Sequence, residues 1–334
     1  MKHKKRYLGI IIVLLFLLGL EQIFLPKINF NKEDDNHLYK IKKYVSINKL
    51  VVKDEEEPTI FFASDYQGDN RYQNIKKLIS ITKKYVTPNL FIICGDYRVS
   101  LDDNYIESER GILELSELIN FSFNIPIITI QGNHDLPNTL GFPKKDYFET
   151  DKYIIYVINR DDFPNNQDIE ENSKEIVEKT SEKLEKFLKK QKSDKPIFIV
   201  THVPLHYTNR NNGKDNMYSS ILFDTINKYS KKLDIVFLYG HNHSGKYDDY
   251  IGGSINYIAK GKYLNVGGIN KLKKLNFTYM NAGYIGFSYN SVNDVSTNLL
   301  SISSIKIKKD SLEIQKYTKD GIYYKKPIII KRRT

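Results

Sequence analysis

The sequence predicts an α/β domain, and three observations favour that class. From Pro58 onward, short apolar runs alternate with amphipathic segments of helical period. The region from Tyr250 to the C-terminus instead contains SISSIKIKK, whose period of two is typical of antiparallel strands. The chain has 334 residues, of which 40% are hydrophobic, and this is enough for one large core.

The chain begins with the basic segment MKHKKR, and the apolar run YLGIIIVLLFLLGL follows at residues 7–20. This order is typical of a secretory signal whose basic end stays in the cytoplasm. No small-x-small cleavage site follows Leu20, and residues 23–25 can lengthen the apolar run toward a full membrane span. We therefore expect residues 1–25 to form a retained signal-anchor helix that crosses the cell membrane once, with the rest of the chain extracytoplasmic. A cleaved signal peptide is the alternative.

Charge distinguishes the next segment and the C-terminal end. Residues 26–57 include KEDDN and KDEEE, and they predict a solvated stalk with a short strand at residues 44–52. Residues 58–324 form the predicted globular domain, and residues 325–334 form a basic tail. The net charge of +11 comes largely from the two ends of the chain, so we expect no nucleic acid recognition. The only cysteine, Cys94, cannot form an intramolecular disulfide and fits either redox compartment.

Polar side chains follow five of the apolar runs. Helical periodicity places helices between the runs, at residues 71–85, 107–119, 167–190 and 217–232. The runs are TIFFAS before Asp65, LFIICG before Asp96, IPIITIQG before Asn133 and His134, PIFIVT before His202, and DIVFLYG before His241 and His243. In open α/β sheets the ligand site lies beyond the carboxyl ends of the strands, so we expect these side chains to converge.

The spacing of these residues indicates metal binding. In an extended chain, residues i and i+2 project to the same side, so His241 and His243 can both face the site, as can Asp65 and Gln67. Two such pairs, together with a shared carboxylate, suit two divalent metal ions. Mixed nitrogen and oxygen ligands point to Mn, Fe or Zn, and a single cysteine excludes a thiolate site.

Each of these features alone also has a purely structural explanation. Gly95-Asp96 and GNHD can be ordinary turns, and His202 can be a hydrogen-bonded core histidine. In combination, SDYQ, GDYR, GNHD, TH and GHNH resemble, in that order, the signature blocks of the calcineurin-like metallophosphoesterase superfamily, across residues 65–243. The resemblance implies a four-layer αββα sandwich, with two mixed sheets flanked by helices, for the metallophosphoesterase domain at residues 58–324.

The resemblance also implies roles for individual residues. Asp65, Gln67 and His243 would hold one metal ion, Asn133, His202 and His241 the other, and Asp96 would bridge them. His134 would be the acid catalyst and Asp135 its orienting partner, with a turn or helix N-cap as the alternative for Asp135. The family pattern has histidine where this chain has Gln67. An amide oxygen is a weaker and harder donor than imidazole, so we expect the first ion to bind less tightly or to differ in identity.

These features predict a metal-dependent phosphoesterase that acts on a phosphate-ester substrate. The expected reaction is hydrolysis of a phosphodiester or phosphomonoester by a metal-bridging hydroxide, with His134 as general acid. A diester is favoured because nothing resembles the capping domain of nucleotidases. Arg98 and His206 are candidate substrate-binding residues. The alternative is a catalytically silent, metal-stabilised binding module at the cell surface.

Overall fold

The computed structural model describes residues 37–67, 72–97, 105–136, 139–159, 161–162, 170–192, 195–208, 216–243, 257–268, 270–286 and 300–333. His37–Thr334 forms one compact unit. The predicted anchor at residues 1–25 lies outside the described residues. Among the residues that are described, no helix combines the length and apolar character needed to cross a membrane.

The first sheet is mixed, with the strand order β14-β13-β12-β1-β2-β3, and β15 also pairs with β13. Strands β1, β2 and β3 are parallel, whereas β12 to β15 join the sheet in antiparallel pairs. The bounds are β1 Thr59–Ala63, β2 Leu90–Cys94, β3 Ile127–Ile130, β12 Ser301–Ile307, β13 Ser311–Thr318, β14 Gly321–Ile322 and β15 Ile328–Lys331.

The second sheet is also mixed, with the order β4-β5-β6-β7-β11-β8. Its four central strands are parallel, and β4 and β8 are antiparallel edge strands. The bounds are β4 Tyr147–Glu149, β5 Ile154–Ile158, β6 Ile197–Thr201, β7 Ile235–Tyr239, β8 Tyr257–Ile258 and β11 Thr278–Asn281. A separate antiparallel pair is formed by β9 Tyr263–Asn265 and β10 Leu272–Lys274.

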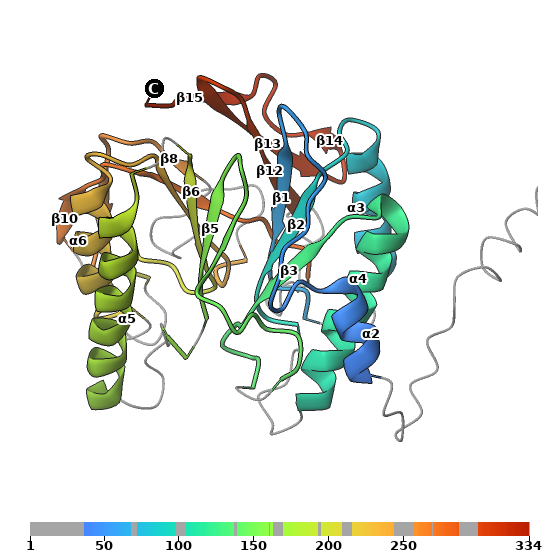
Figure 1. Cartoon of the computed structure of the whole chain (residues 1–334), viewed down its shortest axis with the longest axis horizontal. Helices are drawn as coiled ribbons and strands as arrows, with labels where there is room; N and C mark the ends of the chain where they lie inside the picture. Colours follow the sequence, from blue (N-terminus) through green and yellow to red (C-terminus); the bar gives the residue numbers. More distant parts are fainter. Residues whose placement is uncertain are drawn as a thin grey trace, which may run out of the picture. The chain divides into compact units, whose positions relative to one another are not determined.

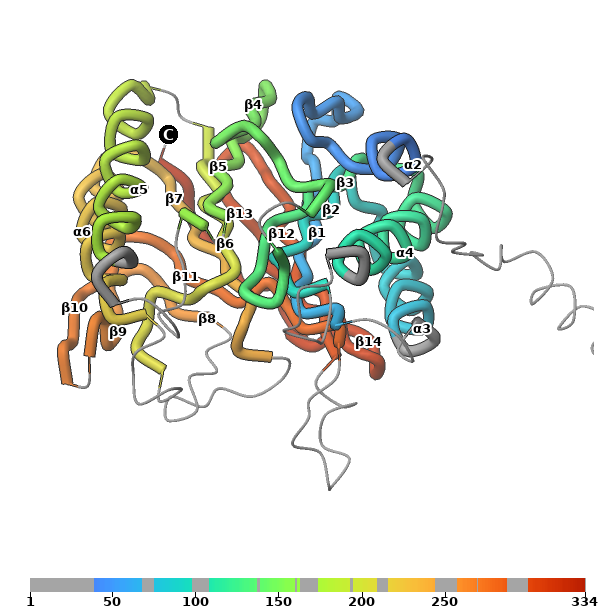
Figure 2. The backbone as a smooth tube through the Cα atoms, turned by 90° about the horizontal axis from the view of Figure 1, so that it is seen from below, coloured from blue at the N-terminus to red at the C-terminus, as the bar shows by residue number. Residues whose placement is uncertain are grey.

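Helices cover the outer face of each sheet, which gives four layers in the order αββα (Figures 1 and 2). Beside the first sheet lie α3 Tyr72–Lys83, α4 Tyr105–Phe123 and α2 His37–Tyr44. Beside the second lie α5 Glu170–Lys190 and α6 Ser219–Tyr229. The four helices predicted by periodicity correspond to α3, α4, α5 and α6, which differ from them by a few residues at the ends.

A hydrophobic core on each face of the second sheet explains why its strands are continuous apolar runs. One core lies between the sheets, where Phe62 and Ile92 of the first sheet belong to the same cluster as Val200 of the second. The other lies between the second sheet and its helices, where Phe237 belongs to a cluster with Leu222. Strands covered on both faces need apolar side chains at every position, and β1, β2, β5, β6 and β7 are buried throughout.

The structure corrects the predicted stalk at residues 26–57 from His37 onward, and residues 26–36 lie outside the described part of the chain. From His37 on, this segment is part of the compact unit. Helix α2 and the residues after it bury Ile41, Val45 and Ile47. The strand expected at residues 44–52 is reduced to an isolated bridge between Val45 and Ile127. The prediction was wrong because the charged residues of this segment alternate with the few apolar residues that pack inward.

The predicted basic tail at residues 325–334 is also wrong. Ile328–Lys331 forms β15, which pairs with β13 in the first sheet. The backbone N–H of Arg333 then donates a hydrogen bond of 2.7 Å to the Asp234 carboxylate, next to the start of β7. Ile328 and Ile330 pack against the core between the sheets, and this burial outweighs the effect of the flanking charges.

Candidate metal centre

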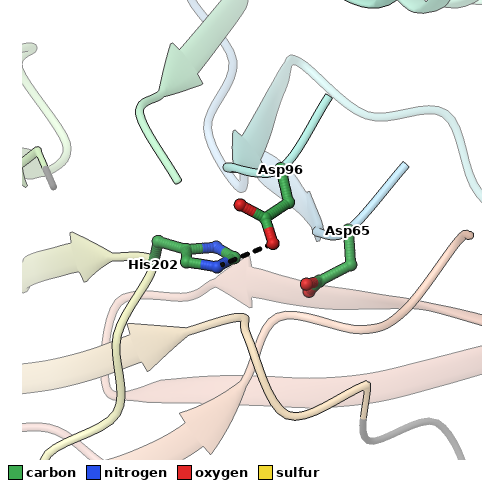
Figure 3. A group of neighbouring side chains, drawn as sticks. All are labelled: Asp65, Asp96 and His202. Carbon is green, nitrogen blue, oxygen red and sulfur yellow. Dashed lines mark ion pairs between the residues drawn. The ribbon is translucent and has the colours of Figure 1, made fainter. Parts of the chain in front are cut away.

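The carboxyl ends of the parallel strands bring the predicted metal ligands together. Asp65 follows β1, Asp96 follows β2 and His202 follows β6, so the centre takes residues from both sheets. Figure 3 shows these three side chains pointing toward one another. Each offers a ligand atom within 4.8 Å of the others. The convergence expected at the edge of the sheets is therefore present.

One group of donors consists of Asp65, Gln67 and His243. The Nε2 atom of His243 lies 3.2 Å from Oδ1 of Asp65 and 3.2 Å from Nε2 of Gln67. The oxygen and nitrogen of a glutamine amide exchange places by a half-turn of the amide group, so Gln67 can present its oxygen to the same point. Asp65 and Gln67 are buried, whereas the His243 side chain is 22% exposed.

A second group consists of Asn133, His202 and His241. Oδ1 of Asn133 lies 2.9 Å from Nε2 of His202 and 2.7 Å from Nδ1 of His241, and those two nitrogens are 3.3 Å apart. Nδ1 of His202 is 2.6 Å from the carbonyl oxygen of Cys94. Because a carbonyl only accepts, Nδ1 must carry a proton and donate it, which turns Nε2 toward the other donors.

Asp96 lies between the two groups and interacts strongly with His202. Its Oδ2 atom is 3.2 Å from Nε2 of His202, and its Oδ1 atom accepts a 2.9 Å hydrogen bond from the backbone of His134. Burial acts to raise the pKa of Asp96, but the His202 imidazole outweighs it and the pKa is lowered. Burial likewise acts to lower the pKa of His202, but Asp96 outweighs it and raises that pKa to about 9.

The backbone at these positions is unusual. Among the described residues, seven other than glycine have positive φ, and five of them are Asp65 (58°), Gln67 (51°), Asp96 (60°), His241 (69°) and His243 (44°). The expectation that the i and i+2 pairs lie in extended chain is therefore wrong, although both members of each pair do reach the site. Left-handed backbone is unfavourable outside glycine and persists only where neighbouring structure holds it.

Two glycines allow the loops to come this close. A Cβ atom at Gly132 would overlap the carboxylate of Asp96, and a Cβ atom at Gly240 would overlap the hydroxyl of Ser64. The backbone N–H of His241 also donates a 3.0 Å hydrogen bond to Oδ2 of Asp65. The loop after β7 is thus locked against the loop after β1, which joins the two sheets at the site.

The structure places His134 at the site but gives Asp135 a different role from the one predicted. The His134 side chain is 22% exposed, with Nε2 at 3.9 Å from Oδ2 of Asp96. Asp135 is fully buried, and its two oxygens accept four hydrogen bonds, none of them from His134. The donors are the backbone N–H groups of Asp96, Tyr97 and Gly132 and the hydroxyl of Ser108, at 2.8 to 3.0 Å. Asp135 therefore holds the loops that carry Asp96 and Asn133, closer to the turn alternative.

The two candidate substrate-binding residues have different outcomes. Arg98 lies outside the described residues. His206 is 1% exposed, with Nδ1 at 2.8 Å from the Tyr279 hydroxyl and Nε2 at 3.1 Å from the Asn242 amide. A substrate cannot reach such a side chain, so the prediction for His206 is wrong. Its ring lies beneath the loop that carries His241 and His243.

Sequence reasoning missed Tyr284. Its ring stacks on the imidazole of His243, with centroids 4.7 Å apart and planes inclined by 10°. Tyr284 belongs to NAGYIG, residues 281–286, which has glycines on both sides of the aromatic residue. Glycines mark backbone that approaches another segment closely, and that was the available signal.

The donor set fits divalent cations. Asp65, Asp96 and Asp135 are all buried within one region. In the part of the chain that the structure describes, the cationic groups within ion-pair distance of Asp65 and Asp96 are histidines. Burial, followed by the Asp96 charge, raises the pKa of Asp135 to about 6. Buried carboxylates need a nearby positive charge, and carboxylate, amide and imidazole ligands suit Mn, Fe or Zn.

Solved structures share this fold. PhoD matches with a TM-score of 0.53 at 10% identity, covering 84% of this chain and 69% of PhoD. A dimetal phosphatase from Danio rerio matches with a TM-score of 0.50 at 10% identity, covering 83% of this chain and 99% of that one. At such low identity the likeness shows the fold alone. None of the curated proteins has a sequence that matches this one.

A family model identifies the group to which the chain belongs. The model for calcineurin-like phosphoesterases matches residues 58–245, which is more than half of the 334 residues. The matched region contains all seven predicted metal ligands, His134 and Asp135. This chain is therefore a member of the calcineurin-like phosphoesterase family, and its activity in general terms is metal-dependent hydrolysis of phosphate esters.

Proposed function

We propose that this chain is a dinuclear metal-dependent phosphoesterase. One ion is held by Asp65, Gln67 and His243, the other by Asn133, His202 and His241, with Asp96 shared between them. The observation that carries the proposal is the convergence of Asp65, Asp96 and His202, whose ligand atoms lie within 4.8 Å of one another. The flanking donors fall into two groups on either side of these three residues.

The proposed chemistry divides between the ions and the chain. When bound, divalent cations activate water as a nucleophile at neutral pH and offset charge on the phosphoryl oxygens. His134 is partly exposed at the rim, and its backbone is fixed by Asp96. It can therefore give a proton to the departing oxygen, a contribution of roughly 100-fold to 10,000-fold. Asp135 acts indirectly, because its four hydrogen bonds fix the loops that present Asp96 and Asn133.

We also propose a phosphodiester as the preferred substrate and Mn, Fe or Zn as the ions. The proposed location is the outer side of the cell membrane, with residues 1–25 as a single-pass anchor. The support for this location is the basic segment followed by the apolar run at residues 7–20. Protease added to intact cells should digest the domain. Complete protection of the domain in intact cells, with digestion after lysis, would refute the location.

Activity is tested with the purified full-length chain, stripped of metal by a chelator and reloaded with Mn, Zn or Fe. A chromogenic diester and a chromogenic monoester are offered to wild type, Asp96→Asn and His134→Ala. Asp162→Asn is a matched control, because Asp162 is a partly buried aspartate that follows β5 and takes no part in the proposed centre. We expect turnover by wild type and by the control, with faster cleavage of the diester.

The two site variants should fail in different ways. Asp96→Asn should lose metal and activity together, whereas His134→Ala should keep its metal and lose roughly 100-fold or more of its turnover rate. Equal trace release of product by all four proteins under every metal would overturn the proposal. If wild type still bound two ions in that case, the silent binding module would take its place.

A further inference from the structure

The segment from Asn281 to Gly286 runs between the metal loops of both sheets. The N–H of Ala282 donates a 2.8 Å hydrogen bond to the carbonyl of Tyr239, the last residue of β7. The N–H of Ile285 donates a 3.0 Å hydrogen bond to the carbonyl of Ser64, directly before Asp65. The segment is therefore anchored to the loop that carries His241 and His243 and to the loop that carries Asp65 and Gln67.

Tyr284 lies at the centre of this segment, and its stack with His243 is close to parallel. Tyr284 is fully buried, so its ring presents a fixed face to the imidazole. That face contacts one side of the imidazole, whose Nε2 atom lies 3.2 Å from Asp65 and 3.2 Å from Gln67. The backbone φ of 44° at His243 makes such external support necessary.

Gly286 fixes the same group of ligands from its other end. A Cβ atom at this position would overlap the carbonyl oxygen of Asp65 and lie 2.8 Å from that of Tyr66. The segment thus packs against the backbone of Asp65 so closely that no side chain fits at Gly286. The Asn281–Gly286 segment therefore contacts both the backbone of Asp65 and the ring of His243.

Two ligands of the other group, His202 and Asn133, are held by different contacts. His202 is oriented by the carbonyl of Cys94, and Asn133 follows a loop that Asp135 fixes. We propose that Tyr284 is a positioning residue for His243, so that its stack on the imidazole sets the affinity of the first metal site separately from the second. This inference rests on the proposed dinuclear function. It matters most at the first site because Gln67 is there a weaker donor than histidine.

The test measures metal binding by the full-length chain rather than turnover. Wild type, Tyr284→Leu and Tyr284→Phe are stripped of metal and titrated with Mn²⁺, and the bound ions are counted after dialysis. Electron paramagnetic resonance then distinguishes a single Mn²⁺ from an exchange-coupled pair. Tyr153→Leu is the matched control, because Tyr153 is an equally buried tyrosine that precedes β5, at the end of that strand opposite the site.

We expect two ions in wild type, in Tyr284→Phe and in Tyr153→Leu. Tyr284→Leu should bind one ion with wild-type affinity and the other about 10-fold to 100-fold more weakly, with the signal of a single Mn²⁺. If this variant does not fold, Tyr284→Met carries the same expectation, since methionine fills more of the space without an aromatic face.

Two results would overturn the inference. One is a leucine or methionine variant that binds both ions as wild type does. The other is equal weakening of both sites in the Tyr284 and Tyr153 variants, which would show a general loss of stability. Failure of wild type itself to bind two ions would instead refute the proposed dinuclear centre.

Discussion

Gly240→Ala is predicted to destabilise the chain by crowding Ser64. The added Cβ atom would overlap the Ser64 hydroxyl and lie 2.6 Å from its Cβ and 2.9 Å from the carbonyl of Cys94. Ser64 has little room to move, because its hydroxyl donates a 2.7 Å hydrogen bond to the same carbonyl. Overpacking of this kind costs about 1–3 kcal/mol. The alanine also restricts the unfolded chain, which stabilises the folded state by roughly 0.4–1 kcal/mol. We therefore expect the free energy of unfolding to fall by about 1–2 kcal/mol in total.

Ser64→Gly supplies the control, because it removes the two Ser64 atoms that the new methyl group meets and leaves only the Cys94 carbonyl, at 2.9 Å. Alone it should cost about 1–2 kcal/mol, from one hydrogen bond and a more flexible unfolded chain. If the two changes acted independently, the double variant would lose about 2–4 kcal/mol. Because relief of the overlap recovers most of the stability lost to crowding, we expect the double variant to lose only about as much stability as Ser64→Gly alone.

The assay is equilibrium unfolding in urea, followed by circular dichroism on metal-free protein, for wild type, both single variants and the double variant. A coupling free energy of about 1–2 kcal/mol in favour of the double variant supports the contact. Additive losses would show that Gly240 and Ser64 do not meet as described. Mn²⁺ binding by the same proteins should follow stability, because the turn after Gly240 carries His241 and His243.

Three further predictions address other parts of the chain. Since the pKa of His202 is raised to about 9 in the metal-free chain, its proton must leave on binding, and apparent affinity for Mn²⁺ should fall up to tenfold per pH unit below that value. Calorimetry in two buffers of different ionisation enthalpy should find about one proton released at pH 7. Absence of proton release would contradict the ion pair between His202 and Asp96. Asp135→Asn should lower the unfolding free energy by about 1–3 kcal/mol, since one amide oxygen replaces two carboxylate oxygens that accept four hydrogen bonds. His134→Ala should change the unfolding free energy by less than about 0.5 kcal/mol. Ile330→Asp should lower the free energy of unfolding in urea by about 2 kcal/mol or more. Ile329→Asp, on the exposed face of β15, should lower it by about 0.5 kcal/mol or less. Equal effects of the two variants would contradict the placement of β15.

The order of apolar runs and polar endings was enough to predict the parallel strands and the meeting of their carboxyl ends. Such runs are informative because a strand buried on both faces has no tolerance for polar side chains. The two groups of candidate ligands followed from the resemblance of SDYQ, GDYR, GNHD, TH and GHNH to family blocks, and the structure brings the members of each group within hydrogen-bond distance of one another. Their roles as ligands remain the proposal to be tested.

The sequence could not predict contacts that depend on backbone conformation or on distant packing. An i and i+2 spacing is compatible with extended chain and with the left-handed turns found at His241 and His243, and only tertiary contacts select between them. Asp135 neighbours His134 in sequence, yet a turn directs its carboxylate to the N–H groups of Asp96 and Tyr97. Charges at residues 325–334 concealed β15, whose stability depends on pairing with β13.

The two halves of the centre differ in how they are supported, and this difference bears on the glutamine at position 67. His202 is oriented by a hydrogen bond to the Cys94 carbonyl, a directional contact that fixes both the proton and the plane of the ring. His243 is oriented by a stack on Tyr284, which fixes the plane but permits movement within it. A site whose imidazole is held by a stack and whose partner is an amide can adapt to ions of different radius, whereas a site with a hydrogen-bonded imidazole favours one geometry. We therefore expect the first site to discriminate less among Mn, Fe and Zn than the second, and equal discrimination at the two sites in a competition dialysis would contradict this.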